Sequence, residues 1–311
     1  MNTQTHTQQM NAWKIMATAC MACLSLFFSC TYGTPDENWT KNGKVRLTLD
    51  WQGAPHPSRM DYYFYREGSG IPLIRRAGAN GFEGTLPSGT YSVMVCNPDP
   101  YNILLETENG YEKVNGMVKH VSVLKSESSP SFLTGPEKLQ GCGGESLPVG
   151  GEEATAKTLY PVDLVRKLEL YIKITKGGKG EIALAGLTGY LSGVSQGVYI
   201  PSGAALSDTP AFMAFEPECL GEGRYRALLT LFGLTDSEAT RLYLVLKKED
   251  GKELTTSVGI PREVGDMFRQ KTSSRVILDL VVAYDEVTGL SISLEDWNEG
   301  TGESGVTGNG I

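Results

Sequence analysis

Residues 45–51 read Val-Arg-Leu-Thr-Leu-Asp-Trp, and the spacing of apolar residues in this stretch decides the fold class. Val45, Leu47, Leu49 and Trp51 fall on one face, and the three residues between them, all polar, fall on the other. Successive side chains of a β-strand point to opposite faces, so a period of two is typical of a strand with one buried face. The stretch therefore predicts a half-buried strand.

The same pattern recurs along the chain, with Gly, Pro, Asn and Asp between the segments. Further strands are expected at residues 62–65, 91–95, 117–124, 168–174, 211–215, 224–231, 242–246, 276–282 and 291–294. Asp250 and Gly251 fit a hairpin turn. Helices are expected only at residues 161–166 and 261–270, where a proline suits the first helical position. Short strands with few helices predict an all-β chain of two β-sandwiches in series rather than an α/β fold.

The composition changes between Ser126 and Ala156, where Ser, Gly, Pro and Glu dominate. Loops this long are functional or serve as linkers, so this stretch is interpreted as a loop that ends at a domain boundary. Phe132 and Leu133 could hold its first part against the first domain. The chain is then divided into a lipoprotein signal peptide (1–29), an N-terminal tether (30–43), an N-terminal β-sandwich (44–155), a C-terminal β-sandwich (156–298) and a flexible glycine-rich tail (299–311).

The N-terminal segment has the features of a bacterial lipoprotein signal peptide. After Lys14, an apolar run from Ile15 to Phe28 is too short to cross a bilayer comfortably, and it ends in Ser29 and Cys30. Cys30 is the predicted lipidation site and the first residue of the mature chain. Two or more acyl chains on that residue would hold the protein stably at a membrane.

Two alternatives stay open at this end of the chain. Cys20 and Cys23 each follow an alanine and are rival lipidation sites, although cleavage there would leave an apolar stub on the mature chain. The other alternative is an ordinary signal peptide with a structural Cys30. No later stretch is apolar enough to predict a transmembrane helix.

Composition argues against several partners and chemistries. The net charge of −8, with no long basic run, argues against nucleic acid as a partner. Cys96, Cys142 and Cys219 remain after the signal segment; one disulfide between two of them fits an exported chain, and the spacing does not say which two. Metal-ligand spacing of Cys and His is absent, as is a phosphate-binding loop, so no metal or cofactor is expected.

Residues 193–197, Gly-Val-Ser-Gln-Gly, match the G-x-S-x-G pattern of a hydrolase nucleophile elbow. That elbow needs a helix after the serine, whereas residues 198–201 (Val-Tyr-Ile-Pro) favour a strand. No histidine follows Ser195 to act as its base, and His56 or His120 would have to reach it from the first domain. The stretch is therefore interpreted as a turn or bulge in the second sandwich, and no catalytic residue is assigned.

The remaining polar motifs have simple structural interpretations. Asp50 before Trp51, and the acidic pair 295–296 before Trp297, are expected at strand ends, with the indole covering the core and the acid facing water. Residues 75–76, two arginines, are expected in a solvated loop or edge.

Several segments in a fixed order carry a family resemblance. They are FFSC ending at Cys30, VRLTLDW at 45–51, MDYYFY at 60–65, LPSGTY at 86–91, CNPD at 96–99, YPV at 160–162, GYLSGVS at 189–195 and LEDW at 294–297. With these segments the chain resembles the FimB-like fimbrial accessory or anchor lipoproteins of Bacteroidetes-type fimbriae. The segments span most of the mature chain, and their order carries more weight than any one of them.

This resemblance implies two tandem transthyretin-like β-sandwiches and a lipid-anchored protein at the outer membrane or cell surface, in or at the base of a fimbrium. It implies a fimbrial structural subunit as partner, no enzymatic activity and no cofactor. Stalk subunits of such fimbriae polymerise when a strand of one completes an open sheet of the next, which is a form of β-augmentation. The glycine-rich end, residues 298–311, is a poor donor strand, and this favours an anchoring or terminating role.

An alternative function is a surface or fimbrial-tip lipoprotein that binds a glycan or a host protein. Exposed aromatic side chains would serve it, and Tyr62, Tyr63, Tyr65 and Tyr101 are the candidate contact residues. Packing in the core or at a sheet edge is the favoured interpretation of these tyrosines. An exported hydrolase built on Ser195 is the third and weakest hypothesis.

Overall fold

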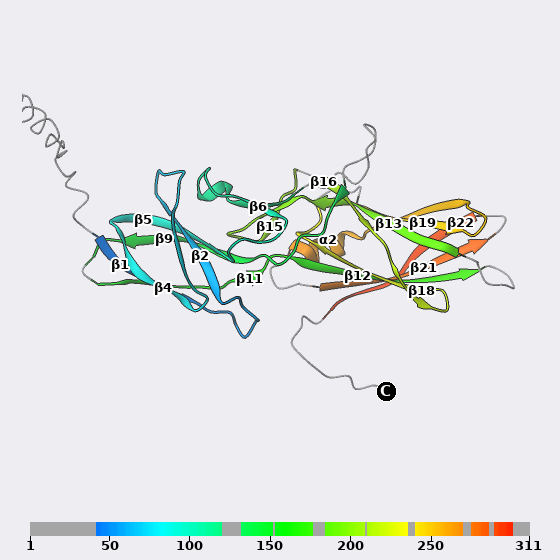
Figure 1. Ribbon diagram of the computed structural model, residues 1–311, viewed down its shortest axis with the longest axis horizontal. Helices are drawn as coiled ribbons and strands as arrows, with labels where there is room; N and C mark the ends of the chain where they lie inside the picture. The colour runs from blue at the N-terminus through cyan, green and yellow to red at the C-terminus, as the bar shows by residue number, and fades with distance from the viewer. Residues whose placement is uncertain are drawn as a thin grey trace, which may run out of the picture. The chain divides into compact units, whose positions relative to one another are not determined.

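The computed structural model describes residues 42–119, 132–151, 153–176, 184–208, 210–235, 240–269, 275–285 and 289–300 (Figure 1). Every element named below belongs to one compact unit, Gly43–Ile311, apart from the first residue of β1. The predicted signal peptide with Cys30 and its rivals, most of the tether, His120 and tail residues 301–311 lie outside the described residues.

Two sheets form the first sandwich. The smaller has three strands in the order β10 (Thr155–Leu159), β1 (Asn42–Leu49) and β4 (Gly81–Pro87), with β10 parallel to β1. The larger has five strands in the order β11 (Val162–Asp163), β9 (Gln140–Val149), β5 (Gly89–Cys96), β2 (Arg59–Arg66) and β3 (Leu73–Gly78).

The alternation in residues 45–51 is confirmed, because the apolar face of β1 and Trp51 are buried and the polar residues between them are exposed. These side chains pack on one face of β2, which contributes Met60, Tyr62 and Phe64 to the same core. The opposite face of β2 is buried as well, since Tyr63 and Tyr65 belong to the second hydrophobic core. A strand buried on both faces has a near-continuous apolar sequence, as β2 does.

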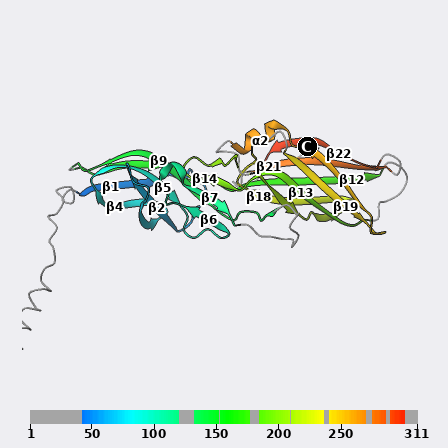
Figure 2. The ribbon, with the colours of Figure 1, turned by 90° about the horizontal axis from the view of Figure 1, so that it is seen from above.

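Two five-stranded sheets form the second sandwich (Figures 1 and 2). One has the order β17 (Glu218–Gly221), β18 (Arg224–Leu231), β12 (Arg166–Lys176), β21 (Arg275–Asp285) and β22 (Gly289–Glu299). The other has the order β20 (Glu253–Gly259), β19 (Arg241–Lys248), β13 (Leu184–Ser195), β16 (Pro210–Phe215) and β8 (Phe132–Leu133). Helix α2 (Arg262–Arg269) adds Val264 and Phe268 to the core between them.

A four-stranded sheet joins the two halves of the chain. Its order is β15 (Ala204–Ala205), β14 (Gly197–Tyr199), β7 (Asn115–Val118) and β6 (Ile103–Glu106), and a 3-10 helix, η2 (Tyr111–Lys113), lies between β6 and β7. In this sheet Gly197 of β14 pairs with Met117 of β7. The second core is continuous from this junction into the second sandwich. Within the described residues, no helix has the length and apolarity to cross a membrane.

The all-β class and the β-sandwich architecture are confirmed, as are the helix near 261–270 and the hairpin turn at Asp250 and Gly251. The helix expected at residues 161–166 is wrong. Val162 and Asp163 form β11 and pair with Gly141 and Gln140 of β9. The proline at the start of this segment is a weak helix signal, and pairing with an open sheet edge overrides it.

The stretch 126–156 is not a loop throughout, because ten of its residues form β9. Its glycines mark places where the backbone is crowded. A side chain at Gly143 would overlap Tyr111 and Pro201, and one at Gly141 would overlap the carbonyl of Val95. A composition that is typical of a linker therefore belongs to a strand under close packing.

The expectation that Phe132 and Leu133 rest against the first domain is also wrong. They form β8, which pairs in parallel with Phe212 and Met213 of β16 in the second sandwich. Of the strand expected at 117–124, β7 accounts for residues as far as 118, and residues from 120 lie outside the described part. The domain boundary at residues 155 and 156 stays a prediction; β10 begins there and pairs with β1.

Candidate functional site

Ser195 ends β13 in a tight turn and has no catalytic geometry. Its buried hydroxyl lies 2.7 Å from each of two acceptors, the carbonyl oxygens of Gly197 and Leu206. Gly193 has φ of 70°, and the pairing of β13 with β16 shifts between Leu191 and Val194, so the predicted bulge is confirmed. The hydroxyl fixes the turn between β13 and β14 and is not available as a nucleophile.

The histidine that the structure describes makes local contacts only. His56 Nδ1 lies 2.9 Å from the carbonyl oxygen of Pro57, and its ring lies 5.5 Å from that of Trp51. Within the described residues, no group of three His, Cys, Asp or Glu side chains gathers in a way that could hold a metal ion.

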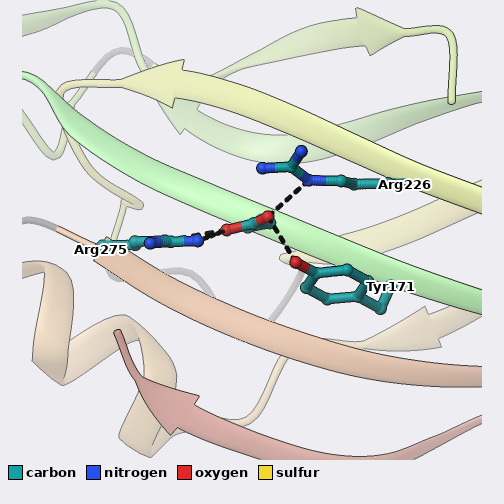
Figure 3. Close-up of polar contacts among 4 residues, drawn as sticks. Tyr171, Arg226 and Arg275 are labelled. Atoms are coloured by element: carbon teal, nitrogen blue, oxygen red, sulfur yellow. Dashed lines mark hydrogen bonds and ion pairs between the residues drawn. The ribbon is translucent and has the colours of Figure 1, made fainter. Parts of the chain in front are cut away.

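The polar face of β12 carries a charged cluster centred on Glu169 (Figure 3). Its carboxylate accepts hydrogen bonds from Arg226 Nε at 2.6 Å, from the Tyr171 hydroxyl at 2.8 Å and from Arg275 Nε at 2.8 Å. Arg275 Nη2 is a fourth donor. Figure 3 shows the three labelled side chains converging on the carboxylate. The Glu169 side chain is completely covered, whereas both arginines stay partly exposed.

The strand register explains this cluster. Glu169 lies directly opposite Leu228 on β18 and Ile277 on β21, so Arg226 and Arg275 are its diagonal neighbours on either side. Long side chains span such diagonals. Burial alone would raise the pKa of Glu169, but the hydrogen bonds from Arg275, Tyr171 and Arg226 outweigh burial and hold the pKa below its usual value. The cluster ties three strands together, and sequence alone could not show it, because partners across a sheet are set by register.

Two acidic residues face each other beside this cluster. Asp279 of β21 lies opposite Asp296 of β22. Partial burial, with the nearby charges of Asp296 and Glu295, raises the pKa of Asp279. As expected, Glu295 and Asp296 are exposed and Trp297 packs against the core.

The candidate tyrosines for glycan binding are mostly buried, as their interpretation as core residues predicts. Tyr62, Tyr63 and Tyr65 lie inside the two cores, whereas Tyr101 is 72% exposed. Sequence analysis did not identify a second cluster of aromatic residues, which lies on the outer face of the sheet that contains β13. Its rings, which pack against one another at 4.5 to 6.2 Å between centroids, are Phe132, Tyr190, Phe212 and Tyr243.

No disulfide joins the three cysteines of the described residues, so the bridge left open by the sequence is absent among them. Cys96 and Cys142 are buried and Cys219 is exposed. Cys96 and Cys142 belong to different cores on opposite faces of the sheet, so their sulfur atoms point apart. Burial raises the pKa of the Cys96 thiol.

The edge strand β3 of the first sandwich is largely exposed. It pairs with β2 on one side, and Leu73, Ile74, Arg75 and Arg76 are all exposed. Arg76 is held by Asp61 through Nε at 2.6 Å and Nη2 at 2.8 Å, and Arg75 Nη1 donates to the Ile74 carbonyl oxygen at 2.8 Å. The two adjacent arginines lie exposed on a sheet edge, as expected, and one of them is also paired with a buried carboxylate.

Comparison with known proteins connects this fold to a family. A family model described as "Domain of unknown function (DUF5119)" matches residues 34–216, which is more than half of the chain. A curated relative from Bacteroides ovatus, described as "Putative fimbrium anchoring subunit Fim4B", is 22% identical over 271 residues, which cover 84% of this chain and 74% of the relative. The resemblance to fimbrial anchor proteins inferred from the sequence is thereby confirmed.

Solved structures share the fold. A protein described as a "putative adhesin" from Bacteroides ovatus superposes with a TM-score of 0.58 at 22% identity, over 72% of this chain and 84% of that one. The fimbrial anchor protein Mfa2 from Porphyromonas gingivalis superposes with a TM-score of 0.51 at 12% identity, over 77% and 90% of the two chains.

Proposed function

The chain belongs to the DUF5119 family of domains of unknown function, and on this premise we propose that it is a lipid-anchored cell-surface protein that anchors, terminates or helps assemble a fimbrium. The observation that carries the proposal is the alignment, along 84% of the chain, with a relative described as a fimbrium anchoring subunit. The partner in this proposal is a fimbrial structural subunit, and the attachment is by β-strand complementation.

The geometry supports a binding role rather than a catalytic one. Ser195, whose motif suggested a hydrolase, has its buried hydroxyl between two acceptors, the carbonyl oxygens of Gly197 and Leu206. The sheets instead end in exposed strands such as β3, whose main-chain groups can receive another strand. A transthyretin-like topology for each sandwich stays an expectation from the family resemblance.

The lipid anchor is proposed at Cys30, at the outer membrane or cell surface. The test is metabolic labelling of the source bacterium with a palmitate analogue, followed by purification of the protein. Label should enter the wild type and be lost in Cys30→Ala. The matched controls are Cys20→Ala and Cys23→Ala, which remove the rival cysteines and should keep the label. An unlabelled wild-type protein, or loss of label in a rival variant alone, would overturn the assignment.

The alternative, binding of a glycan or a host protein, loses most of its candidate residues. Tyr62, Tyr63 and Tyr65 are buried and contribute to hydrophobic packing, so they cannot touch a ligand without unfolding the first sandwich. Tyr101 alone of the four is exposed.

A further inference from the structure

We propose that the exposed edge of β3 binds an extended acidic segment of a partner protein, which adds to the sheet as a further strand. The β3 edge is defined here as residues 71–76, Ile-Pro-Leu-Ile-Arg-Arg. This inference rests on the proposed function in taking strand addition as the mode of assembly. It goes further by naming the edge and the chemistry of the incoming strand.

The β3 edge offers unpaired main chain. β3 is the outermost strand of the five-stranded sheet and pairs only with β2. An edge strand presents alternate N–H and C=O groups on its free side, where another chain can pair with them. All four residues from Leu73 to Arg76 are exposed, so both faces of the strand are accessible in addition to its edge.

The β3 edge also exposes apolar side chains. Ile71 is 71% exposed, Ile74 50% and Leu73 37%, so three of the nine exposed large hydrophobic residues in the described structure lie within four positions. Sheet edges are normally protected by short strands, charges or covering loops. A concentration of exposed apolar side chains on an edge indicates a surface that a partner covers.

The charge of this region selects an acidic partner. Residues 59–78, which form the β2–β3 hairpin, contain four arginines against Asp61 and Glu67, a net charge of +2 in a chain of net charge −8. Arg76 is held by Asp61. Arg75 differs, because no described carboxylate pairs with it and its guanidinium contacts the Ile74 carbonyl oxygen. A backbone N–H of an incoming strand can take over that oxygen and release the guanidinium to a carboxylate of the same strand.

Two other modes of strand addition agree less well with the charges: pairing of two copies through β3, and binding of the acidic strand at β6. Two β3 edges from two copies of the chain would put two arginines from each copy into one short strand pair, and like charges across a strand pair are destabilising. The edge strand β6 exposes Leu104, but its last residue is Glu106, which would repel an acidic strand. Charge therefore directs an acidic segment to β3.

The test uses the full-length chain in detergent and fluorescein-labelled synthetic octapeptides. The probe alternates glutamate and valine. One control replaces glutamate with lysine. A second keeps the glutamates and replaces each valine with proline, which retains the charge but cannot pair as a strand. Binding is measured by fluorescence anisotropy, and amide hydrogen exchange locates the bound peptide.

The acidic valine peptide should bind about tenfold more tightly than either control, and more weakly when salt rises from about 50 to about 300 mM. It should slow amide exchange in Leu73–Gly78. Arg75→Glu should weaken its binding about tenfold, whereas Lys173→Glu, the same charge change at an exposed position of β12, should leave it within about twofold. Equal binding of the proline peptide, unchanged exchange in β3, or equal effects of the two variants would overturn the proposal.

The peptide-binding experiment and the test of the anchoring role can fail independently of each other. If the peptide binds at β3 while deletion of the protein leaves fimbriae attached to cells, the anchoring role fails and the β3 site stands. If fimbriae are shed but the peptide does not bind at β3, the anchoring role stands and the partner attaches elsewhere.

Discussion

Arg76 of β3 lies opposite Asp61 of β2 and forms a bidentate ion pair with it, with Nε–Oδ1 at 2.6 Å and Nη2–Oδ2 at 2.8 Å. The Asp61 side chain is almost wholly buried, whereas Asp99, 3.7 Å from the same guanidinium, is exposed. Arg76 therefore helps to hold the edge strand on the sheet, whereas the neighbouring Arg75 contacts only the Ile74 carbonyl oxygen among the described groups.

Arg76→Ala should lower the free energy of unfolding by about 1–3 kcal/mol, because it leaves a buried carboxylate without its hydrogen-bond donors. Arg75→Ala, the matched control one residue away, should change it by less than about 0.5 kcal/mol. Urea unfolding followed by tryptophan fluorescence measures both. Equal effects of the two substitutions would contradict the division of roles between these arginines.

Glu169 should make the free energy of unfolding decrease as pH falls into the acid range. Its pKa in the folded state is below the usual value, so its contribution is complete above the unfolded-state pKa of about 4.3 and is lost as pH falls through the folded-state pKa. Glu169→Gln removes this contribution. The difference in unfolding free energy between wild type and variant should therefore shrink as pH falls from about 6 to about 3.

The control for this measurement is Glu249→Gln, which changes an exposed carboxylate in the turn after β19. It removes the same charge without touching the Glu169 cluster, and so gives the background against which the Glu169→Gln difference is compared. A Glu169→Gln difference that stays constant with pH, or grows as pH falls, would show that the cluster does not stabilise the ionised carboxylate.

Ser195→Ala should cost about 1–2 kcal/mol of stability, because it removes the donor of a buried hydrogen bond to the carbonyl oxygen of Gly197 or Leu206. Ser293→Ala, which removes an exposed hydroxyl from β22, is the control and should cost less than about 0.5 kcal/mol. Thermal unfolding and an ester-hydrolysis assay are run on both variants. A wild-type esterase activity that disappears in Ser195→Ala without loss of stability would restore the hydrolase hypothesis.

Cys219 should be the first of the three cysteines in the folded body to react with a maleimide. It is exposed, while Cys96 and Cys142 are buried and the pKa of the Cys96 thiol is raised by burial. Mass spectrometry of the native protein should find label on Cys219, and label on all three only after unfolding. A disulfide-linked peptide, or label on Cys96 as fast as on Cys219, would refute this arrangement.

The strands could largely be predicted from the sequence, because alternation and turn residues act locally. Val45 to Trp51 is the clearest case: side-chain period alone gives the strand and its buried face. β9 could not be predicted in this way, since Gly141 and Gly143 are required by neighbours that are distant in the sequence. A glycine-rich strand in a crowded place and a flexible linker have the same composition.

The polar contacts could not be predicted for a related reason. Glu169 meets Arg226 and Arg275 through the register of three strands, and these residues are separated in the chain by 57 and 106 positions. Likewise, the sequence does not distinguish Arg75 from Arg76. The two side chains point to opposite faces of β3, and only Arg76 lies on the face where Asp61 can accept its hydrogen bonds. The turn at Ser195 was predictable, because its glycines and the following β-branched residues are local signals.

The most direct test of the anchoring role is the fraction of fimbriae released into the medium by three strains of the source bacterium. One strain carries the wild-type protein, one lacks it, and one carries Cys30→Ala. The account predicts that fimbriae stay with wild-type cells and are shed from the other two strains. Fimbriae that remain cell-bound without the protein, at wild-type length and amount, would contradict it.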